Sequence, residues 1–159
     1  MDRFLTHLLA RADQGARLAV MTGAAMMVVV VFAQVVMRYV FNGSFDWADE
    51  VSRLAFVWTI FLAIPLGIRD GTHVGIDLIV NHLPSTLRQS IARVMSLLAA
   101  AMMAIIFWTS VIVASVTWSE RLGSMNLTSS IFFFPVIFGA AHACLHLLQM
   151  AWLPTEPKS

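Results

Sequence analysis

The sequence has few charged residues, a single cysteine and no glycine-rich nucleotide loop. Only 12% of its 159 residues are charged and 59% are hydrophobic, with a net charge of +1. Soluble domains carry about 25% charged and about 45–50% apolar residues, so a soluble chain of this size could not bury so much apolar surface. The small net charge argues against nucleic acid as a partner, and Cys144 alone cannot form an internal disulfide. These absences favour a membrane protein.

Residues suited to catalysis are also scarce. The missing phosphate-binding loop excludes ATP chemistry. Catalysis needs a nucleophile beside a base, or paired acids in a cleft. Asp46, Asp49 and Glu50 are neighbouring acids, but they open a predicted helix and lie within reach of Arg53. Capping and ion pairing explain such acids better, so we expect neither an enzyme nor a cofactor.

Four long apolar segments are present instead. Residues 18–37 carry no charge, and about 20 such residues cross the ~30 Å hydrocarbon core of a bilayer. This run exceeds the ~7–15 apolar residues of a signal peptide, so we expect it to be retained. The sequence predicts an all-α integral membrane protein with one four-helix domain over residues 1–159. The predicted spans are about 18–39, 47–68, 92–118 and 129–152.

Polar and small residues inside the spans indicate where helices meet. Gln34 is the one strongly polar residue of the first span, and a buried amide needs a partner, so it should face a neighbouring helix. The third span is rich in small residues, which allow helices to approach closely in lipid. These are Ala99, Ala100, Ala101, Ala104, Ser110, Ala114 and Ser115.

The segments between the spans predict surface helices and an orientation. Residues 1–17 place leucines at helical spacing and should form either an amphipathic helix on the membrane surface or a frayed tail. Residues 74–83 suggest a second interfacial helix. Seven basic residues fall on the side of the two termini and three on the other side. The positive-inside rule then places both termini in the cytoplasm.

The second span is short for a membrane helix. Its uncharged core, residues 54–68, would extend only ~22 Å, against ~30 Å of hydrocarbon. A partner, a water-filled crevice or a thinned bilayer could therefore receive the charged side chains of Asp49, Glu50 and Arg53. Alternatively, these side chains extend to the membrane interface. Trp47, at the start of this helix, and Trp58 lie on the same face as Glu50.

Two histidines on the fourth span suggest an alternative function. His142 and His146 are four residues apart on one face, so they could hold a metal or supply a haem ligand to an electron-transfer subunit. The other histidines, His7, His73 and His82, lie in tails or loops. We therefore prefer two polar packing residues and expect no metal site. A self-contained transporter is disfavoured because charges lie at the span ends rather than at mid-depth.

The residues from 38 to 77 form a recognisable motif. It consists of Arg38-Tyr39-Val40-Phe41, Ser44, Trp47-x-Asp49-Glu50-x-x-Arg53, Phe56, Trp58, Phe61-Leu62 and Arg69-x-Gly71-x-His73-Val74-x-Ile76-Asp77. This motif resembles the small membrane subunit, of the DctQ type, of tripartite ATP-independent periplasmic (TRAP) transporters. Chain length and four spans agree with that family.

The resemblance implies a function and a set of partners. In that family a periplasmic substrate-binding protein captures an organic acid, and a large multi-span subunit of the DctM type moves it by a sodium-driven elevator motion. The chain would then be a scaffold subunit in the bacterial inner membrane that braces the large subunit and helps to dock the binding protein.

The resemblance also implies roles for individual residues, although each of them could instead serve only this subunit's own fold. Six would contact a partner or lipid headgroups at the outer end: Arg38, Trp47, Asp49, Glu50, Arg53 and Trp58. Four would form a cytoplasmic loop motif: Arg69, Gly71, His73 and Asp77.

Overall fold

The computed structural model describes residues 2–69 and 85–152, and the described chain consists of helices joined by loops, with one isolated bridge between Arg121 and Thr128 in the loop at residues 120–128. The helices are α1 (Asp2–Val40), α2 (Ala48–Arg69), α4 (Ser85–Val116), η1 (Thr117–Ser119), η2 (Ser129–Phe132) and α5 (Phe134–Trp152). Four helical segments are long and apolar enough to cross a membrane: Leu9–Val40, Ala48–Arg69, Gln89–Ser119 and Ser129–Trp152. The predicted all-α fold with four spans is confirmed. The predicted interfacial helix at 74–83 lies outside the described residues.

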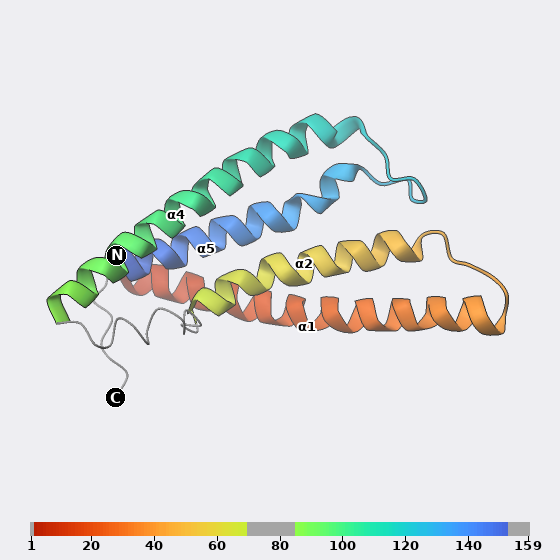
Figure 1. Cartoon of the computed structure of the whole chain (residues 1–159), viewed down its shortest axis with the longest axis horizontal. Coiled ribbons are helices and arrows are strands. Elements are labelled where there is room, and N and C mark those ends of the chain that lie inside the picture. The colour runs from red at the N-terminus through yellow and green to blue at the C-terminus, as the bar shows by residue number, and fades with distance from the viewer. Residues whose placement is uncertain (1, 70–84, 153–159) are drawn as a thin grey trace.

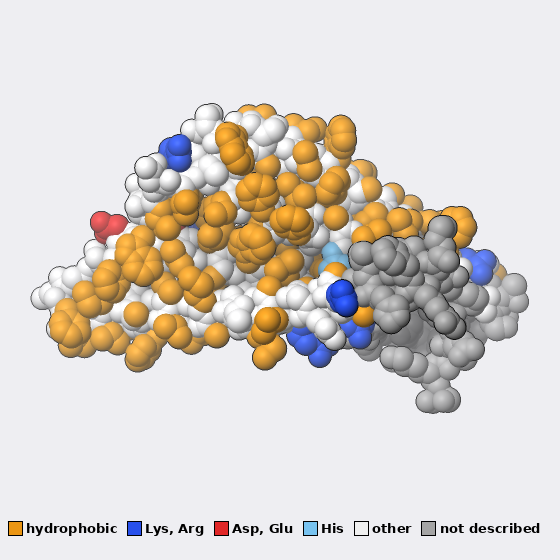
Figure 2. All heavy atoms as spheres, turned by 180° about the vertical axis from the view of Figure 1, so that it is seen from behind, with side chains coloured by type: hydrophobic (Ala, Val, Ile, Leu, Met, Phe, Trp, Pro, Cys, Tyr) orange, Lys and Arg blue, Asp and Glu red, His pale blue; other side chains and the backbone are white. Residues whose placement is uncertain are grey.

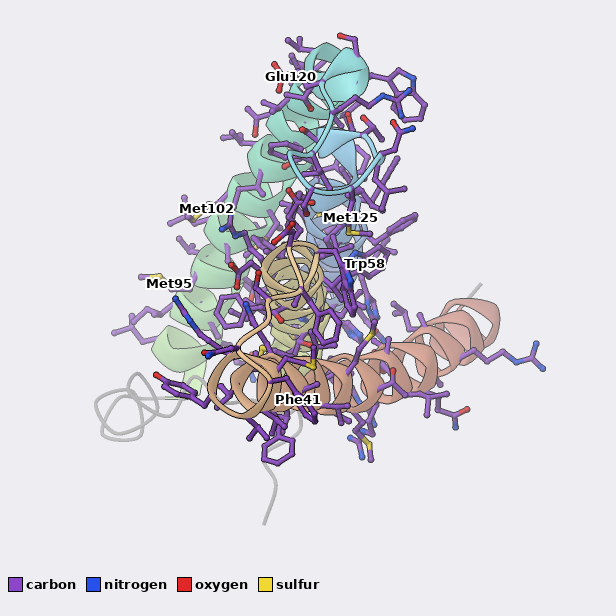
Figure 3. The ribbon with its side chains drawn as sticks, turned by 90° about the vertical axis from the view of Figure 1, so that its right-hand side faces the viewer. Phe41, Trp58, Met95, Met102, Glu120 and Met125 are labelled. Carbon is purple, nitrogen blue, oxygen red and sulfur yellow. The ribbon has the colours of Figure 1, made fainter. Side chains whose placement is uncertain are left out.

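The four long helices form a single layer rather than a closed bundle. Helix α1 packs on α2, α2 on α5, and α5 on α4, which gives the order α4–α5–α2–α1 across the layer (Figure 1). Figure 3 looks along the layer from its side and shows α1 crossing the direction of the other helices. Each helix therefore contacts mainly its neighbours in the row, and the two hairpins meet through α2 and α5.

A single layer leaves much apolar surface uncovered. Figure 2 shows hydrophobic side chains over most of the described part of one face, with few charged side chains among them. Val28 and Phe32 on α1, and Met102 and Trp108 on α4, are each more than half exposed. A soluble monomer rarely exposes contiguous apolar patches beyond a few hundred Å². Lipid tails or a membrane-embedded partner must cover this surface.

Small residues bring the helices of the layer together. The α-carbon of Gly139 on α5 lies so close to the Phe61 carbonyl of α2 that a Cβ at this position would collide with backbone atoms. On α1, a Cβ at Gly23 would stand 2.7 Å from the Thr59 hydroxyl of α2. Ala100, Ser110 and Ala114 on α4 are buried, as the small residues of the third span predicted, whereas Ala101, Ala104 and Ser115 are exposed.

The N-terminal segment corrects one expectation. Residues 2–17 form neither a separate surface helix nor a frayed tail, because α1 continues unbroken from Asp2 to Val40. Leu9, Asp13 and Ala16 are buried. Their spacing of three and four residues places them on one face of the helix, so this segment packs against the other helices. The sequence pattern is amphipathic, but the buried face is covered by protein.

Hydrogen bonds fix the connection between α4 and α5. The Thr128 hydroxyl donates to the Trp118 carbonyl at 2.7 Å, and the fully buried Ser130 donates to the Ala114 carbonyl at 2.6 Å. Between them, the Leu122 amide donates to the Leu127 carbonyl at 2.9 Å. The connection is therefore a short hairpin-like loop held by hydrogen bonds to its own residues and to the end of α4.

Glycine substitutions should reveal which helix contacts hold the layer. We expect Gly139→Ala to destabilise the protein by about 1–3 kcal/mol or more, since backbone atoms of Phe61 cannot move aside. Gly23→Ala should cost less, because the Thr59 side chain can rotate away. Gly15→Ala is the control, since a Cβ at this position would have nothing within 4 Å, and it should be neutral or stabilising. Thermal unfolding in detergent measures the stability of the three variants. Equal losses of stability in Gly15→Ala and Gly139→Ala would contradict the close contact between Gly139 and Phe61.

Candidate functional site: polar clusters at the two ends of the layer

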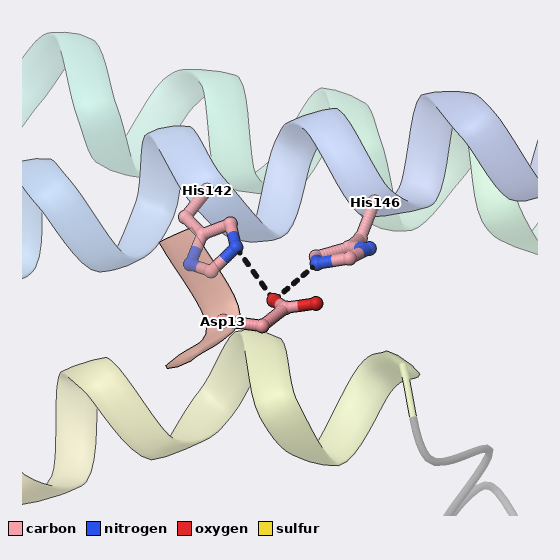
Figure 4. Close-up of side chains that lie close together, drawn as sticks. All are labelled: Asp13, His142 and His146. Carbon is pink, nitrogen blue, oxygen red and sulfur yellow. Dashed lines mark hydrogen bonds and ion pairs between the residues drawn. The ribbon is translucent and has the colours of Figure 1, made fainter. Parts of the chain in front are cut away.

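Four side chains from three helices meet at one end of the layer, and we name them the Asp13 cluster: Asp13, Arg69, His142 and His146. Asp13 lies on α1, Arg69 is the last residue of α2, and both histidines lie on α5. The Nε2 atoms of His142 and His146 are each 2.9 Å from Asp13 Oδ1 (Figure 4). Arg69 Nη1 donates to the other oxygen, Oδ2, at 3.0 Å.

The cluster satisfies a carboxylate that is almost fully removed from solvent. The Asp13 side chain is 4% exposed, and those of His146 and His142 are 8% and 11% exposed, whereas Arg69 is 47% exposed. Burying an unpaired charge is costly, and breaking a buried pair typically costs about 3–5 kcal/mol. Arg69 supplies the opposite charge, and its position in the last turn of α2 also suits the negative end of the helix dipole.

The two histidines do not use the carboxylate equally. His146 Nε2 forms a hydrogen bond with Asp13 Oδ1, and it must be the donor because a carboxylate only accepts. His142 Nε2 lies equally near, but it is buried without a hydrogen bond of acceptable geometry. The imidazole rings are tilted by 40° with centroids 4.9 Å apart. The pair therefore offers one engaged nitrogen and one unengaged nitrogen.

The sequence singles out three members of this cluster but not the fourth. The motif places Arg69 in a loop, whereas it ends α2, and the two histidines are noted for their spacing of four residues on the fourth span. Asp13 carries no such signal, although it is the acid on the face that Leu9 and Ala16 share. Its partner His146 is 133 positions away in the chain, so no spacing rule could join them.

A second polar group lies at the opposite end of the layer. Gln34 on α1 donates to Asp49 Oδ1 on α2 at 2.9 Å, which confirms that Gln34 faces a neighbouring helix. The Ser124 amide in the α4–α5 loop donates to Glu50 Oε1 at 3.0 Å. The expected pairing of Glu50 with Arg53 does not occur among the described residues, whose ion pairs all involve Asp13. The loop amide is the partner that Glu50 meets instead.

Most of the other residues predicted to act at this end of the layer have exposed side chains. Arg38, Trp47 and Arg53 are exposed, and Trp58 is half-buried. The Trp47 ring contacts Phe45, with centroids 5.4 Å apart. Asp49 and Glu50 thus connect parts of this subunit, whereas Arg38, Trp47 and Arg53 are available to other molecules. Gly71, His73 and Asp77 lie outside the described residues.

The geometry of the Asp13 cluster bears on the haem alternative. Both imidazoles come from the same helix and approach the same carboxylate oxygen (Figure 4). A haem bound by both would have to lie between them, where the Asp13 carboxylate stands. The arrangement therefore joins three helices, and it does not offer a slot for a planar macrocycle.

The four long apolar helices define a multi-pass membrane protein. Residues 27–156 match the family described as "Tripartite ATP-independent periplasmic transporters, DctQ component", which covers most of the chain. The chain belongs to this family, as its motif predicted, and it is therefore a TRAP transporter small permease subunit.

Individual relatives agree with the family assignment. The chain is 34% identical over 84 residues, 53% of its length, to a protein of Haemophilus influenzae named as a TRAP transporter small permease protein, and it spans 50% of that relative. It is 35% identical over 68 residues to the C4-dicarboxylate TRAP transporter small permease protein DctQ of Vibrio cholerae, covering 43% of the chain and 29% of the relative. It is 33% identical over 60 residues to the sialic acid TRAP transporter permease protein SiaT of Haemophilus influenzae, covering 38% and 10%.

The Asp13 cluster should determine whether the N-terminal half of α1 stays docked. We expect Asp13→Ala to raise the rate of tryptic cleavage at Arg11 and Arg17 at least tenfold, because a loss of only ~1.4 kcal/mol of docking energy already increases local opening tenfold. Gln14→Ala, at the exposed neighbouring position, is the matched control and should leave the rate unchanged. Cleavage of the purified protein in detergent, followed by mass spectrometry, gives the rates. Equal rates in both variants would show that the cluster does not hold α1.

Proposed function

We propose that this chain is the small scaffold subunit of a sodium-driven, binding-protein-dependent TRAP transporter for organic acids. It would lie in the bacterial inner membrane with both termini in the cytoplasm, beside a large DctM-type subunit. The single helix layer is the observation that carries this proposal. A layer one helix thick exposes two apolar faces, so one face can pack on a membrane partner while the other faces lipid.

The distribution of polar groups supports a brace rather than a transport path. Transport pathways usually show ionisable residues or broken helices near mid-membrane. In the described residues the ionisable side chains gather at the two ends of the layer, in the Asp13 cluster and around Asp49 and Glu50. Both groups link helices or loops of the subunit to one another. Such links suit a rigid support against which another subunit moves.

The relatives support a large membrane partner. SiaT is named as a transporter permease, and this chain matches only 10% of it. A counterpart of this subunit therefore corresponds to a small part of a longer permease. By analogy, the separate chain would bind a separate large subunit, and lipid would cover the remaining surface.

The positive-inside orientation would direct the exposed Arg38, Trp47 and Arg53 towards the periplasm, where they could contact the binding protein or headgroups.

Reconstitution tests the scaffold function. The chain, expressed with a large multi-span subunit, should co-purify with it in detergent. Proteoliposomes that hold both subunits and the binding protein should take up an organic acid when a sodium gradient is imposed, and collapsing the gradient should abolish uptake. The small subunit alone should transport nothing. Full uptake by the large subunit without this chain, or uptake by this chain alone, would contradict the proposal.

Two substitutions should separate contacts to a partner from contacts within the fold. Arg53 is exposed and has no ion pair within the described ranges, so Arg53→Ala should lower recovery of the complex several-fold without changing thermal unfolding of the isolated chain. Asp49 accepts a hydrogen bond from Gln34, so Asp49→Ala should lower the unfolding temperature, at a cost of about 1–3 kcal/mol. If Arg53→Ala instead destabilised the isolated chain and left complex recovery intact, the assignment of Arg53 to the partner surface would be wrong.

A further inference from the structure

We propose that Asp13, His142 and His146 form a binding site for one divalent transition-metal ion of the Zn²⁺ class. The ion would join α1 to α5 at the end of the layer that holds both the N-terminal segment and the C-terminal half of α5. This inference rests on the Asp13 cluster alone and does not depend on the transport function.

The donor atoms already lie nearly at the separations that such an ion requires. One ligand atom from each of the three residues lies within 4.8 Å of the other two, and each histidine Nε2 is 2.9 Å from Asp13 Oδ1. Tetrahedral coordination with bonds of about 2.0–2.2 Å would set donor atoms about 3.4 Å apart. An outward movement of roughly half an ångström at these side chains would therefore admit the ion. The residues need not change helix or face.

The unengaged nitrogen of His142 is the second observation. Its Nε2 is buried beside a carboxylate oxygen, yet it has no hydrogen bond. A buried polar atom without a partner is costly, and in native structures it usually marks a function or a missing ion or water. A cation bound between the two imidazoles and Oδ1 would engage all three atoms at once, and it would require His146 to move its ring proton from Nε2 to Nδ1 so that Nε2 presents a lone pair. It would also explain why His142 is buried beside Asp13 Oδ1, although His146 already donates a hydrogen bond to that oxygen.

The surroundings supply the other parts of a metal site. Arg69 holds Asp13 Oδ2 at 3.0 Å, which turns Oδ1 towards the imidazoles, and such outer-sphere hydrogen bonds orient ligands in metalloproteins. A cavity of about 380 Å³ adjoins the site and is lined in part by Asp13, His146, Gln149 and Met150. It offers an entry path and room for a water molecule as the fourth ligand.

The ligand set selects the ion. Two imidazoles with one carboxylate suit Zn²⁺, Co²⁺, Ni²⁺ or Cu²⁺, whereas Mg²⁺ and Ca²⁺ prefer oxygen ligands. Arg69 has an opposing effect, because its positive charge repels a cation and its hydrogen bond withdraws charge from the carboxylate. The half-exposed side chain can swing into solvent. Arg69 and the ion should therefore compete for Asp13, and this competition distinguishes a metal site from a purely structural cluster.

Metal titration of the full-length protein tests the site. The protein, purified in detergent with a histidine-free tag and dialysed against a chelator, should bind one equivalent of Zn²⁺ with micromolar or tighter affinity, measured with a competing indicator. Co²⁺ should give the intense visible bands of tetrahedral coordination. Asp13→Asn, His142→Ala and His146→Ala should each weaken binding about 100-fold. Cys144→Ser is the control: its thiol faces the Ala100 carbonyl of α4, and its loss should not change affinity.

The Arg69→Gln variant keeps all three metal-binding residues and tests whether Arg69 competes with the ion for Asp13. It should bind Zn²⁺ several-fold more tightly than the unaltered protein, because a neutral amide neither repels the ion nor neutralises Asp13. No saturable binding to the unaltered protein, or a Co²⁺ spectrum without tetrahedral bands, would overturn the proposal regardless of how the variants fold. Unchanged affinity in a well-folded His142→Ala protein, checked by circular dichroism, would overturn it as well.

Discussion

A buried carboxylate must be paired, and Asp13 meets this requirement by joining three helices that are distant in sequence. Lipid tails are as apolar as leucine, so helices in a membrane gain little from burying apolar side chains against each other. Close backbone packing and polar contacts must decide their arrangement. Here the backbone contact is at Gly139 and Phe61, and the polar contact is the bonding of Asp13 to Arg69 and His146. Together they place α1 and α5 on either side of α2.

The single layer follows from where these contacts occur. Each helix carries its small or polar contact residues towards its neighbour in the row, and its other faces carry exposed side chains such as Phe32 and Trp108. The polar groups at the ends of the row, from Gln34–Asp49 to the Asp13 cluster, connect its helices to one another. Under the proposed function, such a layer would bind along the side of a larger membrane protein.

The elements of this fold could be predicted from the sequence better than their arrangement. Charge-free runs define membrane helices because length and hydropathy are local properties, and Gln34 could be assigned to a helix contact because an amide in lipid needs a partner. The row itself could not be predicted, since it depends on which glycine meets which carbonyl.

The candidate site shows the same limit. His142 and His146 are recognisable from their spacing of four residues, but Asp13 is hidden in a segment whose amphipathic pattern suggests a membrane surface. Likewise Glu50 has an arginine nearby in sequence, while the amide of Ser124 is its partner in space. Contacts between distant segments decide both cases, and no local pattern records them.

The structure of the assembled complex in a lipid nanodisc, determined by electron cryomicroscopy, is the most direct test of a scaffold built as one helix layer. We expect the four helices to keep the order α4–α5–α2–α1, with Asp13 bonded to α2 and α5 and one broad face of the layer against the large subunit. Helices closed into a bundle around a bound solute, with no second membrane protein beside them, would contradict it.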